Sequence, residues 1–485
     1  MIKVRLEAVE CFERDAKLRL PFRFGVITVT EATQAVIRVT VALEDGRQGV
    51  GVAAECLAAK WFDKNPAFSD AQNLAQLRQS LALAILHYRG QGWSTPFGLY
   101  SACYKEQLAR GAELGLVALV ASYGPALLDR AILDALGHLN GLSFASMLKR
   151  NVPGIAATEL TPELVGFDLT GFFASLEPRP GIALRHTVGL VDPILASDQA
   201  PSERVGDGLP ETLEEVARRY RGAYYKLKVQ GDVAADLERL RRIAHVLDRE
   251  IGDYRVSLDG NEQFDDIAGI AELWGRMRAT PALERLVAST LFIEQPIKRA
   301  AALARPVGDL AHLKALIIDE SDSELGSFAA ARCLGYTGVS SKNCKGLYKS
   351  VLNAARVAKW NAEVGAPRYF MTAEDLTTLA GVSVQQDLAL VSLLGLEHVE
   401  RNGHHFIDGM SFAPRREQDD FARAHDDLYE QSDNVTRLAI DAGRLRLGSL
   451  DCPGFAVAAS MDFASMRAMP QEALSPLVPA HPERT

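Results

Sequence analysis

Residues 224–231 read YYKLKVQG, a run of aromatic and aliphatic residues that carries two lysines one residue apart. Its aromatic and β-branched residues predict a β-strand. Because alternate side chains share one face of a strand, Lys226 and Lys228 point the same way and Leu227 points to the other face. An exposed edge strand, which uses lysines to resist aggregation, would show the same pattern. The segments around this strand decide between the two interpretations.

Short apolar runs alternate with helical patterns between residues 183 and 403, the order expected of βα units around a parallel sheet. The predicted strands cover residues 184–191, 224–229, 254–260, 291–296, 315–321, 337–342, 367–374 and 397–403. Helical patterns lie between them, for example in 236–250 and 347–365. Eight strands with helical spacers predict an α/β fold, the TIM-type (β/α)8 barrel.

Five successive predicted strands end in charged residues. In order, these are Lys226 and Lys228, Asp259, Glu294, Asp319, and Lys342. Reactive side chains of a (β/α)8 barrel lie at the carboxyl ends of its strands. A single acid there is more often a helix cap or a turn residue, but three carboxylates that converge cannot all stay ionised without a cation. Ligation by oxygen alone suits Mg²⁺.

The lysines then acquire a chemical role in the mouth of the barrel. A second ammonium group nearby and partial burial both favour the neutral form of Lys228, which could then act as a base. Lys342 comes from a strand nearly across the barrel. The two lysines could therefore flank one substrate carbon from opposite sides.

This constellation resembles the enolase superfamily, in particular the mandelate racemase and muconate-lactonizing enzyme family, in its branch of muconate-lactonizing enzyme and the dipeptide epimerases. The matching motifs are Lys226-Leu-Lys228, Asp259-Gly-Asn261, Phe292-Ile-Glu294-Gln-Pro296, Asp319-Glu-Ser321 and Lys342-Asn-Cys-Lys345-Gly346. They occur in the family's order along most of the chain. Two features depart from the family pattern: Ser340 and Ser341 make the sixth strand polar, and Gly346 stands alone where a Gly-Gly pair is usual.

The resemblance implies a Mg²⁺ site, with Mn²⁺ as a substitute. Asp259, Glu294 and Asp319 would bind the metal, with Asn261 in support. Strand parity alone leaves Asp319 and its neighbour Glu320 as alternatives, and the resemblance selects Asp319, so that Glu320 becomes a supporting residue.

The resemblance also implies the roles of the lysines. Lys228 and Lys342 would be the acid/base pair, and Lys226 would tune Lys228 and contact the substrate carboxylate. Loss of the proton next to that carboxylate would give an enolate. A racemase or epimerase is expected, because inversion needs a base on each face. The alternatives are a cycloisomerase or dehydratase that uses one lysine, and a non-catalytic binding protein that retains the fold.

Further polar residues stand where a substrate's distal part would lie. Glu374 ends the seventh predicted strand, Glu400 and Arg401 end the eighth, and Phe22 and Arg23 belong to a predicted lid. These are expected substrate contacts by analogy of fold. A metal site at His404 and His405 is not expected, because adjacent residues point apart.

The predicted domains follow the patterns along the chain. Residues 1–150 are β-rich and then helical, and the resemblance makes them an α+β capping domain. Residues 151–182 are a linker or insertion, 183–403 the barrel, and 404–485 a segment that returns to the capping domain, with a disordered tail. Relative to the family, extra residues are expected at about 85–125, 151–182 and 405–435. Glycines 49 and 51 mimic a dinucleotide-binding loop, but a hairpin explains them better.

The composition is that of an ordinary globular protein, with a net charge of −9 and a pI of about 5.7. This acidic balance disfavours nucleic acid and anionic membranes as main partners. Six scattered cysteines without a CxxC pair indicate reduced thiols. No signal peptide or transmembrane segment is evident. A cytoplasmic protein is expected, a homo-oligomer whose partner is a small carboxylic acid.

Overall fold

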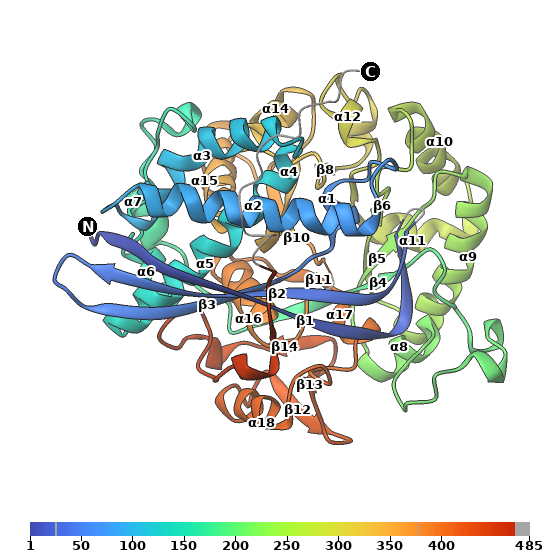
Figure 1. The fold of residues 1–485 in the computed structure, drawn as a ribbon. Helices are drawn as coiled ribbons and strands as arrows, with labels where there is room; N and C mark the ends of the chain where they lie inside the picture. The colour runs from blue at the N-terminus through green and yellow to red at the C-terminus, as the bar shows by residue number, and fades with distance from the viewer. Residues whose placement is uncertain (25–26, 377, 471–485) are drawn as a thin grey trace, which may run out of the picture.

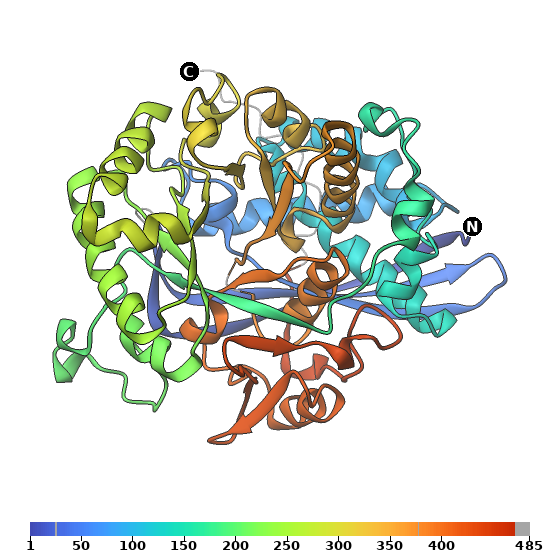
Figure 2. The ribbon, with the colours of Figure 1, turned by 180° about the vertical axis from the view of Figure 1, so that it is seen from behind.

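The computed structural model describes residues 1–24, 27–376 and 378–470 of the 485-residue chain. Its centre is a curled sheet of nine strands (Figures 1 and 2). Eight of them are the predicted parallel strands: β4 (Gly181–Val188), β5 (Tyr224–Lys228), β6 (Arg255–Asp259), β7 (Thr290–Glu294), β8 (Leu316–Ile318), β9 (Gly338–Ser341), β10 (Phe370–Ala373) and β11 (His398–Arg401). Their ladders run in chain order from β4 to β10, and β11 pairs with β4. The predicted (β/α)8 barrel is confirmed.

Helices follow the strands and cover the outside of this sheet (Figure 2). They are α8 (Leu213–Tyr220), α9 (Val233–Glu250), α10 (Ile267–Arg278), α11 (Glu284–Ser289), α12 (Arg299–Ala302), α13 (Leu310–Leu313), α14 (Ser327–Cys333), α15 (Leu347–Val364) and α16 (Val382–Leu393). The short helix α17 (Gly403–Phe406) follows β11 and packs against β1 (Val4–Phe24). The helix ends carry the expected signals. For example, Asp232 caps α9 by accepting from the backbone of Ala234 and Ala235, and Gly365 ends α15 in the left-handed conformation.

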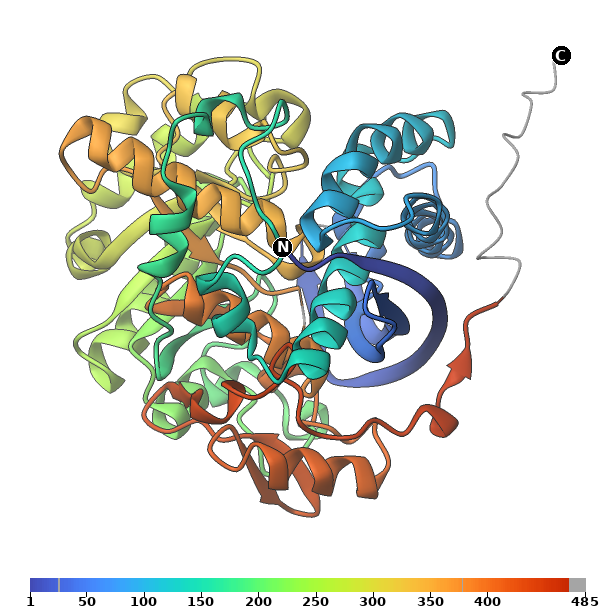
Figure 3. The same cartoon turned by 90° about the vertical axis from the view of Figure 1, so that its left-hand side faces the viewer.

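The N-terminal part forms a layer beside the barrel (Figure 3). Three long antiparallel strands, β1 (Val4–Phe24), β2 (Ile27–Leu43) and β3 (Gln48–Cys56), make most of its four-stranded sheet. The helices of this part are α1 (Ala59–Phe62), α2 (Asp70–Gly90), α3 (Pro96–Glu113), α4 (Ala118–Ala121), α5 (Tyr123–Asn140) and α6 (Phe144–Lys149). One hydrophobic core joins this layer to barrel helix α15, through residues such as Leu128, Tyr348 and Val351. The N-terminal layer is therefore packed directly on the barrel.

Glycines 49 and 51 lie in β3, inside the predicted hairpin. A Cβ on Gly51 would lie 2.1 Å from the carbonyl oxygen of Ala131 and 2.3 Å from the nitrogen of Ala135, both in α5. At Gly49 it would lie 2.4 Å from the side chain of Leu139. These glycines let α5 approach the sheet, so they serve packing and not nucleotide binding.

The segments outside the two main parts are short. Residues 151–182, predicted as a linker or insertion, contain a 3-10 turn (Pro162–Leu164) and helix α7 (Leu169–Ala174) and lead into β4. The C-terminal part comprises α18 (Arg415–Ala424), β12 (Tyr429–Ser432), β13 (Val435–Leu438), β14 (Arg444–Arg446) and β15 (Arg467–Ala468). β14 pairs with β4, and β15 pairs with β1. The predicted disordered tail lies outside the described residues. Among the described helices, none has the length and apolar character needed to cross a membrane.

Candidate active site

Charged side chains from five consecutive strands gather at the carboxyl ends of β5 to β9. Lys226 and Lys228 belong to β5, Asp259 and Glu294 end β6 and β7, and Asp319 and Lys342 directly follow β8 and β9. The register places Lys228 beside Asp259 and Asp259 beside Glu294. All six side chains are buried. The structure therefore brings together the predicted catalytic and metal-binding residues.

Lys226 is the hub of this cluster. Its Nζ lies 2.8 Å from Glu294 Oε1, 2.8 Å from Glu374 Oε2, 3.0 Å from Glu400 Oε2 and 3.1 Å from Asp259 Oδ2. Burial alone would lower its pKa, but the four carboxylates outweigh burial and raise the pKa well above its ordinary value. The four carboxylates therefore favour the ammonium form of Lys226, which suits binding negative charge better than accepting a proton.

Lys228 and Lys342 each hold one carboxylate. Lys228 Nζ donates to Asp259 Oδ2 at 2.6 Å, and Lys342 Nζ donates to Asp319 Oδ2 at 2.7 Å. Lys345 Nζ approaches the other oxygen of Asp319 at 3.2 Å, and Ser340 Oγ also donates to it. The polar serine that departs from the family pattern thus orients Asp319.

The acids differ in their ionisation. Burial raises the pKa of Glu294 well above its ordinary value, and the nearby carboxylates of Asp259 and Glu374 add to this effect. Burial would also raise the pKa of Asp319, but Lys342 and Lys345 outweigh it and hold that pKa well below its ordinary value. A divalent cation among these oxygens would favour the ionised form of all of them.

The chemistry of Asp259, Glu294 and Asp319 suits a hard cation, because all three are carboxylates and they come from three neighbouring strands. Glu294 Oε2 is buried and accepts no hydrogen bond, which leaves one carboxylate oxygen available for such an ion. In this structure the ammonium groups of Lys226, Lys228 and Lys342 neutralise the three carboxylates. Within the described ranges, no three His, Cys, Asp or Glu side chains are arranged closely enough to hold a metal.

The predicted supporting residues contact each other behind the carboxylates. Asn261 Nδ2 donates to Glu320 Oε1 at 3.0 Å, and the backbone nitrogen of Asn261 donates to Asp259 Oδ1 at 2.7 Å. Lys64, from the segment after α1, reaches Glu320 at 3.6 Å. Glu320 therefore faces the N-terminal layer, while its neighbour Asp319 faces the lysines.

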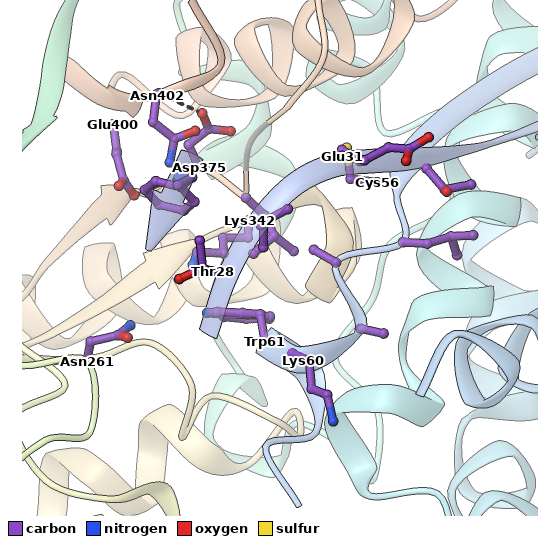
Figure 4. A pocket seen from close by; sticks show the side chains of 18 of the residues that line it. Thr28, Glu31, Cys56, Lys60, Trp61, Asn261, Lys342, Asp375, Glu400 and Asn402 are labelled. Carbon is purple, nitrogen blue, oxygen red and sulfur yellow. Dashed lines mark hydrogen bonds between the residues drawn. The ribbon is translucent and has the colours of Figure 1, made fainter. Parts of the chain in front are cut away.

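A cavity of about 290 Å³ opens above the cluster. Its floor includes Lys226, Lys228, Asp259, Asp319 and Lys342. Its other walls come from β1 to β3, α1 and α2 of the N-terminal layer and from the ends of β10 and β11. Figure 4 shows Thr28, Lys60 and Trp61 of the N-terminal layer opposite Asp375, Glu400 and Asn402 of the barrel. The N-terminal layer therefore roofs the strand ends.

The predicted substrate contacts are placed unevenly. Phe22 and Glu400 line the cavity. Glu374 lies beneath it, ion-paired with Arg185 of β4. Arg401 points away from the cavity toward α16, where it pairs with Asp387, because alternate residues of a strand face opposite sides. Arg23 is not among the lining residues, although its register partner Thr28 is.

Several residues of the site were not predicted from the sequence. Arg185 and Thr187 of β4 bind Glu374 and Glu400, the latter through a Thr187 Oγ1 hydrogen bond of 2.5 Å. Trp61 contacts Lys342 from the N-terminal layer. The alternation along β4 could have indicated Arg185 and Thr187, since both share the inward parity of a strand whose neighbour carries the lysines. Trp61 has no comparable signal, because its segment is a short apolar turn.

No family model matches the sequence, and no curated protein sequence matches it. Solved structures do. The chain is similar to a dipeptide epimerase from Enterococcus faecalis V583 solved with Mg and the dipeptide L-Leu-L-Tyr (13% identity, TM-score 0.59). The match covers 93% of this chain and 99% of the epimerase. It is also similar to an enolase from Bradyrhizobium solved with magnesium and mandelic acid (16% identity, 96% and 98% covered, TM-score 0.57). A mandelate racemase/muconate lactonizing protein from Herpetosiphon aurantiacus is a third (16% identity, 94% and 99% covered, TM-score 0.56).

The chain has the fold of the enolase superfamily. The resemblance inferred from the strand-end motifs is thus confirmed at the level of the fold, and the N-terminal layer corresponds to the capping domain that the resemblance implies. At these identities the likeness concerns the fold alone. The chemistry is argued from the side chains of this chain.

Proposed function

We propose that this protein is a Mg²⁺-dependent enzyme of the enolase superfamily that removes the α-proton of a small carboxylic acid, and that it is a racemase or epimerase. One observation carries the proposal. Lys228 and Lys342 line the same cavity from β5 and the end of β9, four strands apart in an eight-stranded barrel. They therefore approach a bound substrate from opposite sides. Inversion of a carbon centre needs such a pair of proton-transfer groups.

The roles follow from the contacts. Asp259, Glu294 and Asp319 would hold Mg²⁺, which would supply positive charge to the substrate carboxylate. Lys226 is a buried cation at the floor and stabilises the negative charge that develops as the α-proton leaves. Lys228 or Lys342 removes the proton on one face of the substrate. The other lysine returns a proton on the opposite face, which inverts the carbon.

Neighbouring structures support a small carboxylate as the substrate class. The Enterococcus faecalis epimerase holds a dipeptide and the Bradyrhizobium protein holds mandelic acid, both with magnesium. In this chain the cavity floor carries three lysine ammonium groups beside carboxylates, and its upper walls include Phe22, Leu57, Trp61 and Leu376. A carboxylate at the floor and an apolar group toward the roof would match both regions.

The test is proton exchange in D₂O with Mg²⁺, with pools of dipeptides, N-acylamino acids, sugar acids and unsaturated diacids, read by mass spectrometry. Deuterium should enter the α-position of one class of compound. Lys228→Ala and Lys342→Ala should each lose inversion but keep exchange on the face of the remaining lysine. If Lys342→Ala leaves turnover unchanged, the enzyme is a cycloisomerase or dehydratase that works with one lysine.

Binding of the metal can be tested without a substrate. We expect Mg²⁺ to raise the melting temperature of the wild type by several degrees, because a ligand that binds only the folded state stabilises it. Asp259→Asn should abolish this rise. A wild type whose melting temperature ignores millimolar Mg²⁺ and Mn²⁺, and which exchanges no α-proton, would instead be a non-catalytic protein with this fold.

A further inference from the structure

Lys342 has a contact partner outside the barrel. Its Nζ lies 4.1 Å from the centroid of the Trp61 ring, and it also donates a hydrogen bond to Asp319. Trp61 belongs to α1 of the capping domain and is 3% exposed. An ammonium group over an indole face is attracted by the ring quadrupole, most strongly when it is shielded from water. The indole and the carboxylate thus restrict the ammonium group from two directions.

The indole itself is braced by aromatic neighbours. Phe62 meets Trp61 edge-on, with ring centroids 5.1 Å apart and an interplanar angle of 88°. Tyr123 of α5 meets Phe62 in the same manner, at 5.4 Å and 89°. Phe62 and Tyr123 are fully buried. Trp61 therefore cannot swing away from Lys342 without disturbing the core of the capping domain.

Three charged residues, which we call the clasp, fasten α1 to the barrel: Lys64, Glu262 and Arg299. Arg299 follows β7, and its guanidinium donates to the backbone carbonyl oxygens of Phe62 (2.8 Å) and Trp61 (2.9 Å). The same guanidinium binds both oxygens of Glu262 at 2.8 Å. Lys64 pairs with Glu262 at 2.5 Å. The clasp therefore fixes where Trp61 stands relative to the barrel.

The clasp also contacts the residues beside the carboxylates. Lys64 Nζ donates to the backbone carbonyl oxygen of Asn261 at 3.4 Å and lies 3.6 Å from Glu320. Asn261 and Glu320 hydrogen-bond to each other directly behind Asp259 and Asp319. One capping segment, residues 59–64, thus touches the strand end that carries Lys342 and the loops that follow β6, β7 and β8.

We propose that Trp61 is a positioning residue for Lys342, held in register by the clasp, so that a docked capping domain is required to hold this lysine at the cavity edge. The importance of Lys342 rests on the proposed function, but its position does not. A lysine side chain has four rotatable methylene bonds and no fixed direction. The indole face and Asp319 together select one direction, toward the cavity that both lysines line.

The test measures how fast each lysine of the full-length protein reacts with formaldehyde and cyanoborohydride at one fixed pH, with mass spectrometry to separate Lys342 from Lys228. In Trp61→Leu, Lys342 should be methylated at least threefold faster than in the wild type, since the indole no longer covers it. Lys228 should react at its wild-type rate. Trp61→Phe, which keeps an aromatic face, should lie close to the wild type. Equal changes at both lysines, or none at Lys342, would overturn the proposal.

The clasp is tested by the same measurement. Arg299→Leu should accelerate the methylation of Lys342 as Trp61→Leu does, because it removes the hydrogen bonds to the carbonyl oxygens of α1. Lys298→Leu is the matched control: it lies next in the chain, and its ion pair with Asp265 is exposed and outside the clasp. If Lys342 is methylated in Arg299→Leu at the same rate as in this control, the clasp does not position Trp61. Should Trp61→Leu fold poorly, as judged by circular dichroism, Trp61→Phe and Arg299→Leu still decide the matter.

The methylation experiment can succeed or fail independently of the proposed function. Methylation needs no substrate, so it reports on geometry even if no compound exchanges its α-proton. Where a substrate is found, Trp61→Leu should slow exchange on the Lys342 face at least tenfold and leave the Lys228 face unchanged. A purely structural role for Trp61 would slow both faces alike.

Discussion

Lys226 shows how one residue can hold a site together. Replacement by Met would remove the ammonium group and leave four buried carboxylates facing one another. Breaking a buried charge cluster on one side typically costs about 3–5 kcal/mol. We expect Lys226→Met to lower the free energy of urea unfolding at pH 7 by about that amount. Lys298→Met, which breaks an ion pair with 59% and 87% exposed side chains, should leave the free energy of unfolding nearly unchanged.

Unfolding of the wild type and Lys226→Met can also be compared with Mg²⁺ added. A divalent cation held by Asp259, Glu294 and Asp319 would replace part of the charge that Lys226→Met removes, so added Mg²⁺ should stabilise the variant more than the wild type. Equal stabilisation of both proteins would show that the metal, if it binds, does not share the carboxylates that Lys226 contacts.

At the residue scale, the site residues that lie at strand ends could be predicted from the sequence. The site residues that another segment contributes were missed. Asp259, Glu294 and Asp319 could be named because each ends an apolar run. The roles of Glu374 and Glu400 as partners of Lys226 could not be assigned, since parity at the end of a short strand is ambiguous by one residue. Trp61 was missed because its contact with Lys342 exists only after the capping domain docks.

At the scale of elements, local signals were strong. The predicted change from β-rich to helical within residues 1–150 is borne out by α2, whose start is fixed by reciprocal hydrogen bonds between Ser69 and Gln72. The hairpin predicted at glycines 49 and 51 is confirmed: it turns at Asp45 and Gly46 and joins β2 to β3. In residues 151–182 no periodicity was present, and there the structure has only a turn and one short helix. Where polar and apolar side chains alternate, or where helix caps are present, local interactions are sufficient to predict the element.

Gly51 is the element-scale position that we expect to tolerate change least. Valine there would collide with the backbone of α5 at Ala131 and Ala135, which cannot yield as a flexible side chain would. Such overpacking typically costs about 1–3 kcal/mol or more, so Gly51→Val should lower the urea midpoint markedly. Gly275→Ala is the control, because a Cβ there meets nothing within 4 Å on helix α10. It should be neutral or stabilise by up to about 1 kcal/mol. Equal effects of the two changes would contradict close packing of α5 on β3.

At the scale of the whole molecule, the decisive feature is how the capping domain meets the barrel. The sequence predicted both parts and the return of the C-terminal segment, and the pairing of β15 with β1 agrees with that return. The domain boundaries themselves stay a prediction. What the sequence could not supply is the clasp, because Lys64, Glu262 and Arg299 are far apart in the chain and none has a distinctive neighbourhood. Such ion pairs form only when the capping domain docks on the barrel, and no sequence pattern predicts them.

The clasp makes the stability of the molecule depend on pH in a defined direction. Burial alone would raise the pKa of Glu262, but Arg299 and Lys64 outweigh it and hold the pKa at about 2 instead of 4.5. A lowered folded-state pKa means that the stabilisation is complete above pH 4.5 and is lost as the pH falls toward 2. Glu262→Gln should therefore cost about 2–3 kcal/mol of unfolding free energy at pH 6. This difference from the wild type should shrink by about 1–2 kcal/mol at pH 3.5.

Urea unfolding of the two proteins at both pH values measures this convergence. Glu44→Gln is the matched control, because the pair of Glu44 with Lys3 is half-exposed at both ends and far from the barrel. It should follow the wild type at both pH values. A Glu262→Gln penalty that stays constant from pH 6 to pH 3.5 would mean that the carboxylate contributes packing and not charge. The clasp would then hold the capping domain through the Arg299 contacts to the α1 carbonyls alone, and acid would leave the roof over Lys342 in place.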